Sequence, residues 1–148
     1  MARQATEDVT LVAVHLTLTA AYAGFQWTVR AVVYPQFALV PPDVFPAYES
    51  RHQQRITRVV GPLFAGQGVT TLWLLAARPE GTPLLPVLLG AACLAVVLGA
   101  TALGAVPLHR RLGTAWDDAA YRRLLRVDTL RAVAATVGTA AALAALFG

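Results

Sequence analysis

The chain has 148 residues, of which 57% are hydrophobic and 14% charged, with a net charge of +4. Charged residues approach a quarter of a typical soluble domain, and the apolar blocks here are longer than a domain of this size can bury. The composition therefore excludes an ordinary soluble domain and predicts one all-α integral membrane domain over residues 1–148. The 12 basic residues are all arginines and cluster at the ends of apolar blocks, so we expect no nucleic-acid partner.

The first predicted span covers about residues 9–34. Val9 to Val29 is free of charge over roughly 21 residues, enough to cross a hydrocarbon core of about 30 Å. Tyr34-Pro35 is expected to end this helix, because the residue before a proline avoids the α region. Ala21-Tyr22-Ala23 resembles a signal-peptide cleavage site, but the preceding segment is too acidic. We therefore expect an uncleaved first span.

One polar stripe follows this span, at His15, Thr19, Tyr22 and Gln26. The spacing places these side chains on one helix face, which is expected to face the bundle or a cavity rather than lipid. Hydrogen bonding between helices would explain the stripe as well as a ligand would. His15 lies about 16 Å along the helix axis from Gln26 and is expected to belong to no site near the other histidines.

The second span is predicted at residues 59–77, at the end of a helix that begins near Val44 with Asp43 as its cap. The first half of this helix is polar and basic, and Gly61-Pro62 is expected to kink it. One face carries residues spaced three or four apart: Tyr48, His52, Arg55 and Val59.

The third and fourth spans are predicted at residues 84–106, closed by Pro107, and at residues 129–147. The fourth helix has an amphipathic start, capped by Thr114 or Asp117. The short connection at residues 78–83 makes the second and third spans antiparallel. The predicted architecture is an up-and-down four-helix bundle. Stripes of small residues permit close helix packing or a homo-oligomer, at Ala91, Ala95 and Gly99 and at Ala134, Gly138 and Ala142.

Arginine counting predicts the orientation. Only Arg3 and Arg78 are predicted on one side of the membrane, and the other arginines flank the first and third connections on the opposite side. Basic residues stay cytoplasmic, so both termini are expected to face outward.

This topology brings ionisable and polar residues to one membrane level, where such groups are costly unless paired or wetted. Candidates for catalysis are His52, His109, Arg55, Arg131 and Asp128, and candidates for substrate binding are Gln26, Tyr34 and Tyr48. Asp128 is the one acid expected near the spans, and its i, i+3 spacing pairs it with Arg131. The alternative interpretation is a structural ion pair, with the boundary arginines reaching lipid phosphates.

Two histidines from different helices are also compatible with haem or a metal ion. The chain has no Glu-x-x-His, Cys-x-x-Cys or HExxH motif and lacks the carboxylates of a di-iron site. We therefore predict no metal ligands and leave the cofactor open, with proton transfer by the histidines as the alternative role. The lone Cys93 excludes an intramolecular disulfide, and no Walker loop, GxGxxG or nucleophile elbow is present.

These motifs together resemble a mostly uncharacterised family of small four-span bacterial membrane proteins, itself loosely similar to the anthrone-oxygenase-like group. The resemblance covers most of the chain and rests on four segments: Tyr34-Pro35, Phe45 to Leu63, Val106 to His109, and Leu124 to Arg131. It implies oxidation of a hydrophobic, often aromatic, substrate by dioxygen, at His52, Arg55, His109, Asp128 and Arg131. The family often has Asn-Trp where this chain has Asp128-Thr129, which puts the role of Asp128 in doubt.

Two functions remain open from the sequence. The first is an oxidoreductase of the bacterial inner membrane that acts on a lipophilic small molecule in a polar pocket near the cytoplasmic boundary. One of the two histidines would act as the general base, while Arg55 and Arg131 stabilise negative charge. The second is a non-catalytic protein that binds membrane lipid or a partner, or a small transport or accessory subunit.

Overall fold

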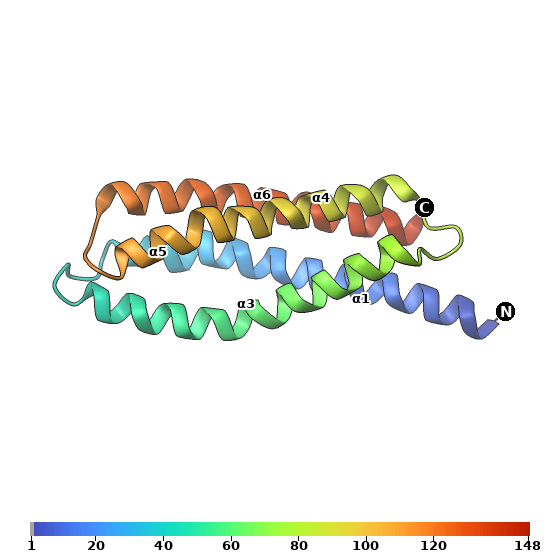
Figure 1. The fold of residues 1–148 in the computed structure, drawn as a ribbon, viewed down its shortest axis with the longest axis horizontal. Coiled ribbons are helices and arrows are strands. Elements are labelled where there is room, and N and C mark those ends of the chain that lie inside the picture. The colour runs from blue at the N-terminus through green and yellow to red at the C-terminus, as the bar shows by residue number, and fades with distance from the viewer. Residues whose placement is uncertain (1) are drawn as a thin grey trace.

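The computed structural model describes residues 2–148, with side chains from residue 9 onward. Arg3, which enters the predicted orientation, lies outside the residues whose side chains are described, as do the acids of the leader. Within the described residues, four long helices run up and down beside one another (Figure 1). The predicted all-α four-helix bundle is confirmed.

Each of these helices is long and apolar enough to span a membrane: Val9–Phe37, Phe45–Ala76, Leu84–Leu112 and Asp118–Phe147. A helix of 29 residues is about 43 Å long, which exceeds a hydrocarbon core of about 30 Å, so its ends reach the headgroup regions. The chain is thus a multi-pass membrane protein, and its helices extend beyond the predicted apolar spans.

Two of the spans contain a π-helical segment that ends two positions before a proline. The first span consists of α1 (Ala2–Thr28), η1 (Val29–Val33) and α2 (Tyr34–Phe37). The third span consists of α4 (Leu84–Ala100), η2 (Thr101–Ala105) and α5 (Val106–Leu112). Tyr34 and Val106 keep right-handed helical angles, and their backbone N–H groups donate to Val29 and Thr101. The predictions that Tyr34-Pro35 and Pro107 end their helices are therefore wrong. A wider turn with bonds five residues back accommodates the proline that an α-helical turn would reject.

The two remaining helices differ in how they begin. α3 (Phe45–Ala76) is continuous through Pro62 and bows along its length (Figure 1). No side chain caps it, so the predicted role of Asp43 is wrong. α6 (Asp118–Phe147) is capped as predicted, because the carboxylate of Asp117 accepts the backbone N–H of Ala120 at 2.9 Å. That hydrogen bond, together with Arg111, lowers the pKa of the Asp117 carboxyl.

Small residues let the helices approach closely. α6 packs against α1 and α4, whereas α3 packs mainly against α1. A Cβ added at Gly138 of α6 would lie 3.3 Å from Cys93, and one added at Gly104 of η2 would lie 3.0 Å from Val127. Because Ala134, Gly138 and Ala142 are buried, this stripe packs helices within the chain rather than a second copy.

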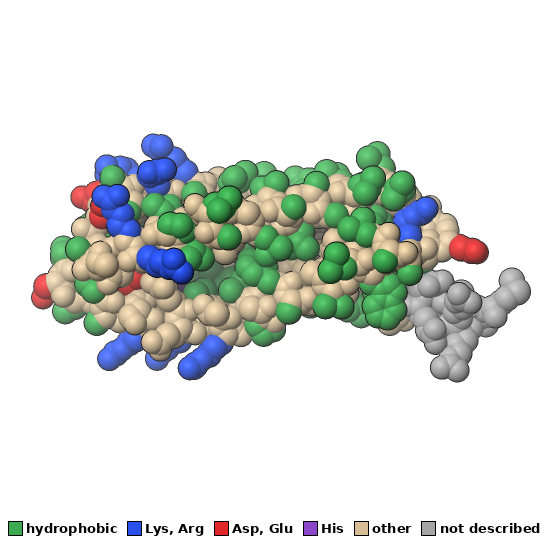
Figure 2. All heavy atoms as spheres, viewed as in Figure 1, with side chains coloured by type: hydrophobic (Ala, Val, Ile, Leu, Met, Phe, Trp, Pro, Cys, Tyr) green, Lys and Arg blue, Asp and Glu red, His purple; other side chains and the backbone are tan. Residues whose placement is uncertain are grey.

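The charges gather at one end of the bundle. Figure 2 shows basic side chains concentrated at the end that holds the α2–α3 and α5–α6 connections. The N- and C-termini and the α3–α4 connection lie at the opposite end (Figure 1). We call the first of these the arginine-rich end.

Candidate functional site

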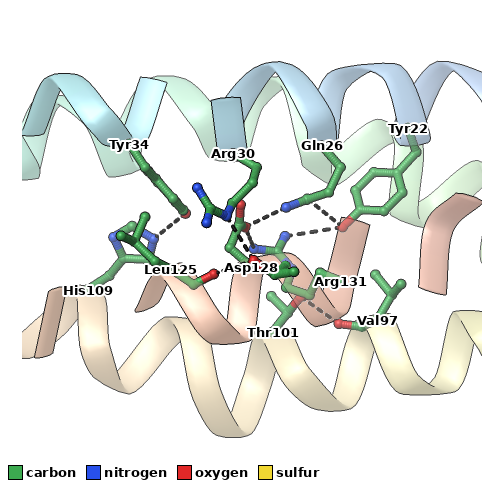
Figure 3. Close-up of polar contacts among 11 residues, drawn as sticks. Tyr22, Gln26, Arg30, Tyr34, Val97, Thr101, His109, Leu125, Asp128 and Arg131 are labelled. Atoms are coloured by element: carbon green, nitrogen blue, oxygen red, sulfur yellow. Dashed lines mark hydrogen bonds and ion pairs between the residues drawn. The ribbon is translucent and has the colours of Figure 1, made fainter. Parts of the chain in front are cut away.

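A buried polar cluster lies about 15 Å into α6 from its start, a depth set by the helical rise. We call it the Asp128 cluster, and it contains Tyr22, Gln26, Asp128 and Arg131 (Figure 3). The Asp128 carboxylate accepts hydrogen bonds from the Gln26 amide and, at 3.1 Å, from the Arg131 guanidinium. Arg131 also donates to the Tyr22 hydroxyl at 3.2 Å, and that hydroxyl donates to the Gln26 carbonyl oxygen at 2.9 Å. The predicted pairing of Asp128 with Arg131 is confirmed.

Burial makes this cluster energetically demanding. Asp128 is 0% and Arg131 6% exposed, so each charge depends on its partner and on the surrounding hydrogen bonds. Among the described residues, Asp128 Oδ2 and Arg131 Nε have no hydrogen-bond partner. Buried polar atoms are nearly always paired, so these two atoms are exceptions within the cluster.

A second polar chain lies nearer the arginine-rich end. It joins Glu49 of α3, His109 of α5 and Tyr34 of α2, and we call it the Glu49 relay. His109 Nδ1 lies 2.5 Å from Glu49 Oε1, and His109 Nε2 lies 2.9 Å from the Tyr34 hydroxyl. With the ring proton on Nδ1, His109 donates to the Glu49 carboxylate and its Nε2 accepts the proton of Tyr34. This order places a base behind the Tyr34 hydroxyl.

Surrounding groups hold the relay in place. Gln53 donates to Glu49 Oε1 at 3.0 Å and to the backbone carbonyl of His109 at 3.2 Å. Tyr121 of α6 donates to the backbone carbonyl of Tyr34 at 3.1 Å, next to the proline that follows the π segment. Such supporting contacts fix the ring orientations that proton transfer requires.

A partly open cavity of about 130 Å³ lies between the Asp128 cluster and the Glu49 relay. By the same measure one water needs roughly 10–15 Å³, so the space admits a small organic group. Gln26 and Arg131 line it on one side, and Tyr34, Gln53 and His109 on the other. Most of the remaining wall is apolar: Phe25, Val29, Ile56, Val60, Ala105 and Val106. Figure 2 shows a recess between α3 and the η2–α5 segment, the elements that contribute much of this wall.

Three predicted site residues lie on a different surface. Tyr48, His52 and Arg55 line an outer groove of about 400 Å³ between α3 and η1. Arg55 is exposed. It lies two positions after Gln53, which turns it about 200° away around the helix. The expectation that Arg55 and Arg131 share one pocket is therefore wrong.

His52 separates the groove from the relay. Its ring stacks on that of His109, with centroids 5.7 Å apart and an interplanar angle of 28°. The two histidines are neighbours, as the predicted topology requires, although His109 lines the cavity and His52 the groove. The described residues contain no group of three or more His, Cys, Asp or Glu side chains able to hold a metal ion.

The sequence argument missed Glu49, which is 0% exposed. The expectation that Asp128 is the one acid near the spans is wrong, because α3 begins at Phe45 and already belongs to the bundle at Glu49. A periodic signal was present: Glu49, Gln53, Ile56 and Val60 are spaced 4, 3 and 4, which places them on one helix face.

The polar stripe of the first span faces the interior, as predicted. His15, Thr19, Tyr22 and Gln26 are all buried. His15 Nδ1 lies 2.8 Å from the Thr70 hydroxyl of α3, in the half of the bundle away from the relay. This contact is the hydrogen bonding between helices that the sequence offered as one explanation.

The fold and the site define a polytopic α-helical membrane protein with a mostly apolar cavity that a few polar side chains line. No protein-family model, curated protein or solved structure matches the chain.

Proposed function

We propose that this protein is a membrane-embedded enzyme, an oxidoreductase of the oxygenase type, that removes a proton from a lipophilic small molecule in the cavity. The observation that supports this is the pairing of a Glu–His–Tyr relay on one wall with a buried arginine on the other. A proton acceptor and a cation that face the same space favour formation of a substrate anion.

The residues suggest a concerted proton transfer. The Tyr34 oxygen takes a proton from a phenol or an activated methylene while its own proton passes to His109 Nε2. The imidazolium that forms is stabilised by Glu49, and Tyr34 stays neutral throughout. The substrate anion is stabilised by Arg131, which lines the cavity.

Oxidation by dioxygen would follow from this anion, as the resemblance to anthrone oxygenases implies. In such a reaction a methylene carbon loses two hydrogens and gains one oxygen atom as a carbonyl. The second oxygen atom of O₂ leaves as water. The apolar lining and the recess between membrane-spanning helices support a substrate that arrives from the lipid phase.

A second candidate function is binding without turnover, by an accessory or carrier protein. The observation that favours it is that Gln26 and Arg131 line a mostly apolar cavity, which suits a small lipophilic ligand with one polar group.

Turnover assays separate the two candidates. Purified protein in nanodiscs would be given anthrone or a quinol, with O₂ uptake and product absorbance measured. We expect His109→Ala to slow oxidation by about 10²–10⁴-fold, as for loss of a general base. Thr57→Val, which also lines the cavity but lies outside the relay, serves as the control. Unchanged turnover in His109→Ala would end this mechanism, and a retained ligand without turnover would favour the second candidate.

We also propose that the arginine-rich end faces the cytoplasm of a bacterial cell, with both termini outside. The arginine asymmetry supports this orientation. A C-terminal alkaline phosphatase fusion is expected to be active and a C-terminal green fluorescent protein fusion to be dark. The reverse pattern would invert the topology.

A further inference from the structure

The outer groove, of about 400 Å³, is a second hollow beside the cavity. One wall is the face of α3 that carries Tyr48, His52 and Arg55, and Val33 of η1 forms part of the other. The groove has a different lining from the cavity, with Ile56 as their shared residue. It is therefore a separate surface that the proposed reaction does not use.

Two arginines without acidic partners line this groove. Arg51 and Arg55 are exposed, lie one helical turn apart, and have no ion pair among the described residues. By contrast, Arg111 contacts Asp117 at 2.5 Å and Arg131 contacts Asp128 at 3.1 Å. Like charges at i, i+4 repel one another, so an anion between Arg51 and Arg55 would remove an unfavourable interaction.

The groove also changes polarity along its length. The arginines lie toward the arginine-rich end of α3, whereas Ile56 and Val59 lie toward the middle of the bundle. Arg51 and Val59 are about 12 Å apart along the helix axis. A basic end at the membrane boundary followed by an apolar end within the membrane matches a molecule with an anionic head and a hydrocarbon tail.

We propose that the outer groove binds an anionic phospholipid. Its phosphate lies between the guanidinium groups of Arg51 and Arg55, and an acyl chain packs on Val33, Ile56 and Val59. Because His52 lines the groove and stacks on His109, the bound lipid contacts the outer wall of the Glu49 relay. A zwitterionic lipid fits less well, since its own cation offsets the attraction to the arginines.

Native mass spectrometry tests this proposal without reference to turnover. The protein would be released from nanodiscs that contain equal amounts of phosphatidylglycerol and phosphatidylcholine. We expect phosphatidylglycerol to be retained preferentially, and retention to fall about thirtyfold in Arg51→Gln/Arg55→Gln, roughly fivefold for each arginine. Arg122→Gln/Arg123→Gln removes the same charge from exposed positions of α6 and serves as the matched control.

Three results would overturn the proposal. These are equal retention of the two lipids by the wild-type protein, equal losses in the two double variants, or displacement of the lipid by millimolar inorganic phosphate. The comparison of lipids in the wild-type protein needs no variant to fold. His109→Ala is expected to keep the lipid, so failure of the proposed reaction and failure of this site are distinguishable.

Discussion

Replacing Arg131 by methionine tests whether the Asp128 cluster is held together by charge. Methionine fills a comparable volume but removes the hydrogen bonds to Asp128, at 3.1 Å, and to Tyr22, at 3.2 Å. The carboxylate of Asp128, 0% exposed, would keep only the hydrogen bond from Gln26.

Removing one partner of a buried ion pair costs about 3–5 kcal/mol, because the remaining charge stays buried and uncompensated. For a chain of this size that cost corresponds to a fall in Tm of roughly 6–20 °C. Adding Asp128→Asn to the Arg131→Met variant removes the unpaired buried charge and keeps an acceptor for Gln26. We therefore expect the double variant to recover most of the lost stability, with a coupling energy of up to about 3 kcal/mol.

The measurement is thermal unfolding in mild detergent, followed by tryptophan fluorescence, of the wild type, both single variants and the double variant. Equal stability of Arg131→Met and the wild type would refute the reasoning. So would a double variant no more stable than Arg131→Met, since the loss would then come from packing rather than charge.

Two further predictions concern the helix contacts and the cap of α6. Gly104→Ala is expected to lower Tm, because its new methyl group would lie 3.0 Å from Val127 of α6. Gly99→Ala, with open space around it, is expected to keep or raise Tm. Equal changes in Tm for the two variants would contradict the close approach at Gly104. The backbone hydrogen bond from Ala120 lowers the pKa of Asp117 in the folded protein. The ionised carboxylate therefore stabilises the fold above the unfolded pKa of about 4, and this contribution is lost as the pH falls through the folded pKa. Asp117→Asn is therefore expected to flatten the acid side of a Tm-against-pH curve. An unchanged curve would show that titration of Asp117 contributes nothing to the stability.

The elements were predictable from the sequence because hydrophobic length and arginine placement act locally. The pairing of Asp128 with Arg131 followed from their i, i+3 spacing, and the nearness of His52 to His109 followed from an up-and-down topology. These inferences need only helical geometry and the order of the spans.

The missed features depend on tertiary structure. Glu49 looked like one residue of a polar lead-in, and only the packing of α3 against α5 makes it the partner of His109, 60 positions away. The prediction that the prolines end their helices was wrong for a related reason. Their local preference ends an α-helix, but both helices continue through a π turn before Pro35 and Pro107.

The most direct test of the proposed site is the absorption spectrum of a chromogenic nitrophenol bound to the protein in nanodiscs. If the Glu49 relay and Arg131 stabilise an anion in the cavity, the bound phenol should ionise at a lower pH than in protein-free nanodiscs. This shift should become smaller in His109→Ala, where Arg131 alone remains, and persist in full in Thr57→Val. A phenol that ionises at the same pH with the wild type, with His109→Ala and without protein would contradict the central claim.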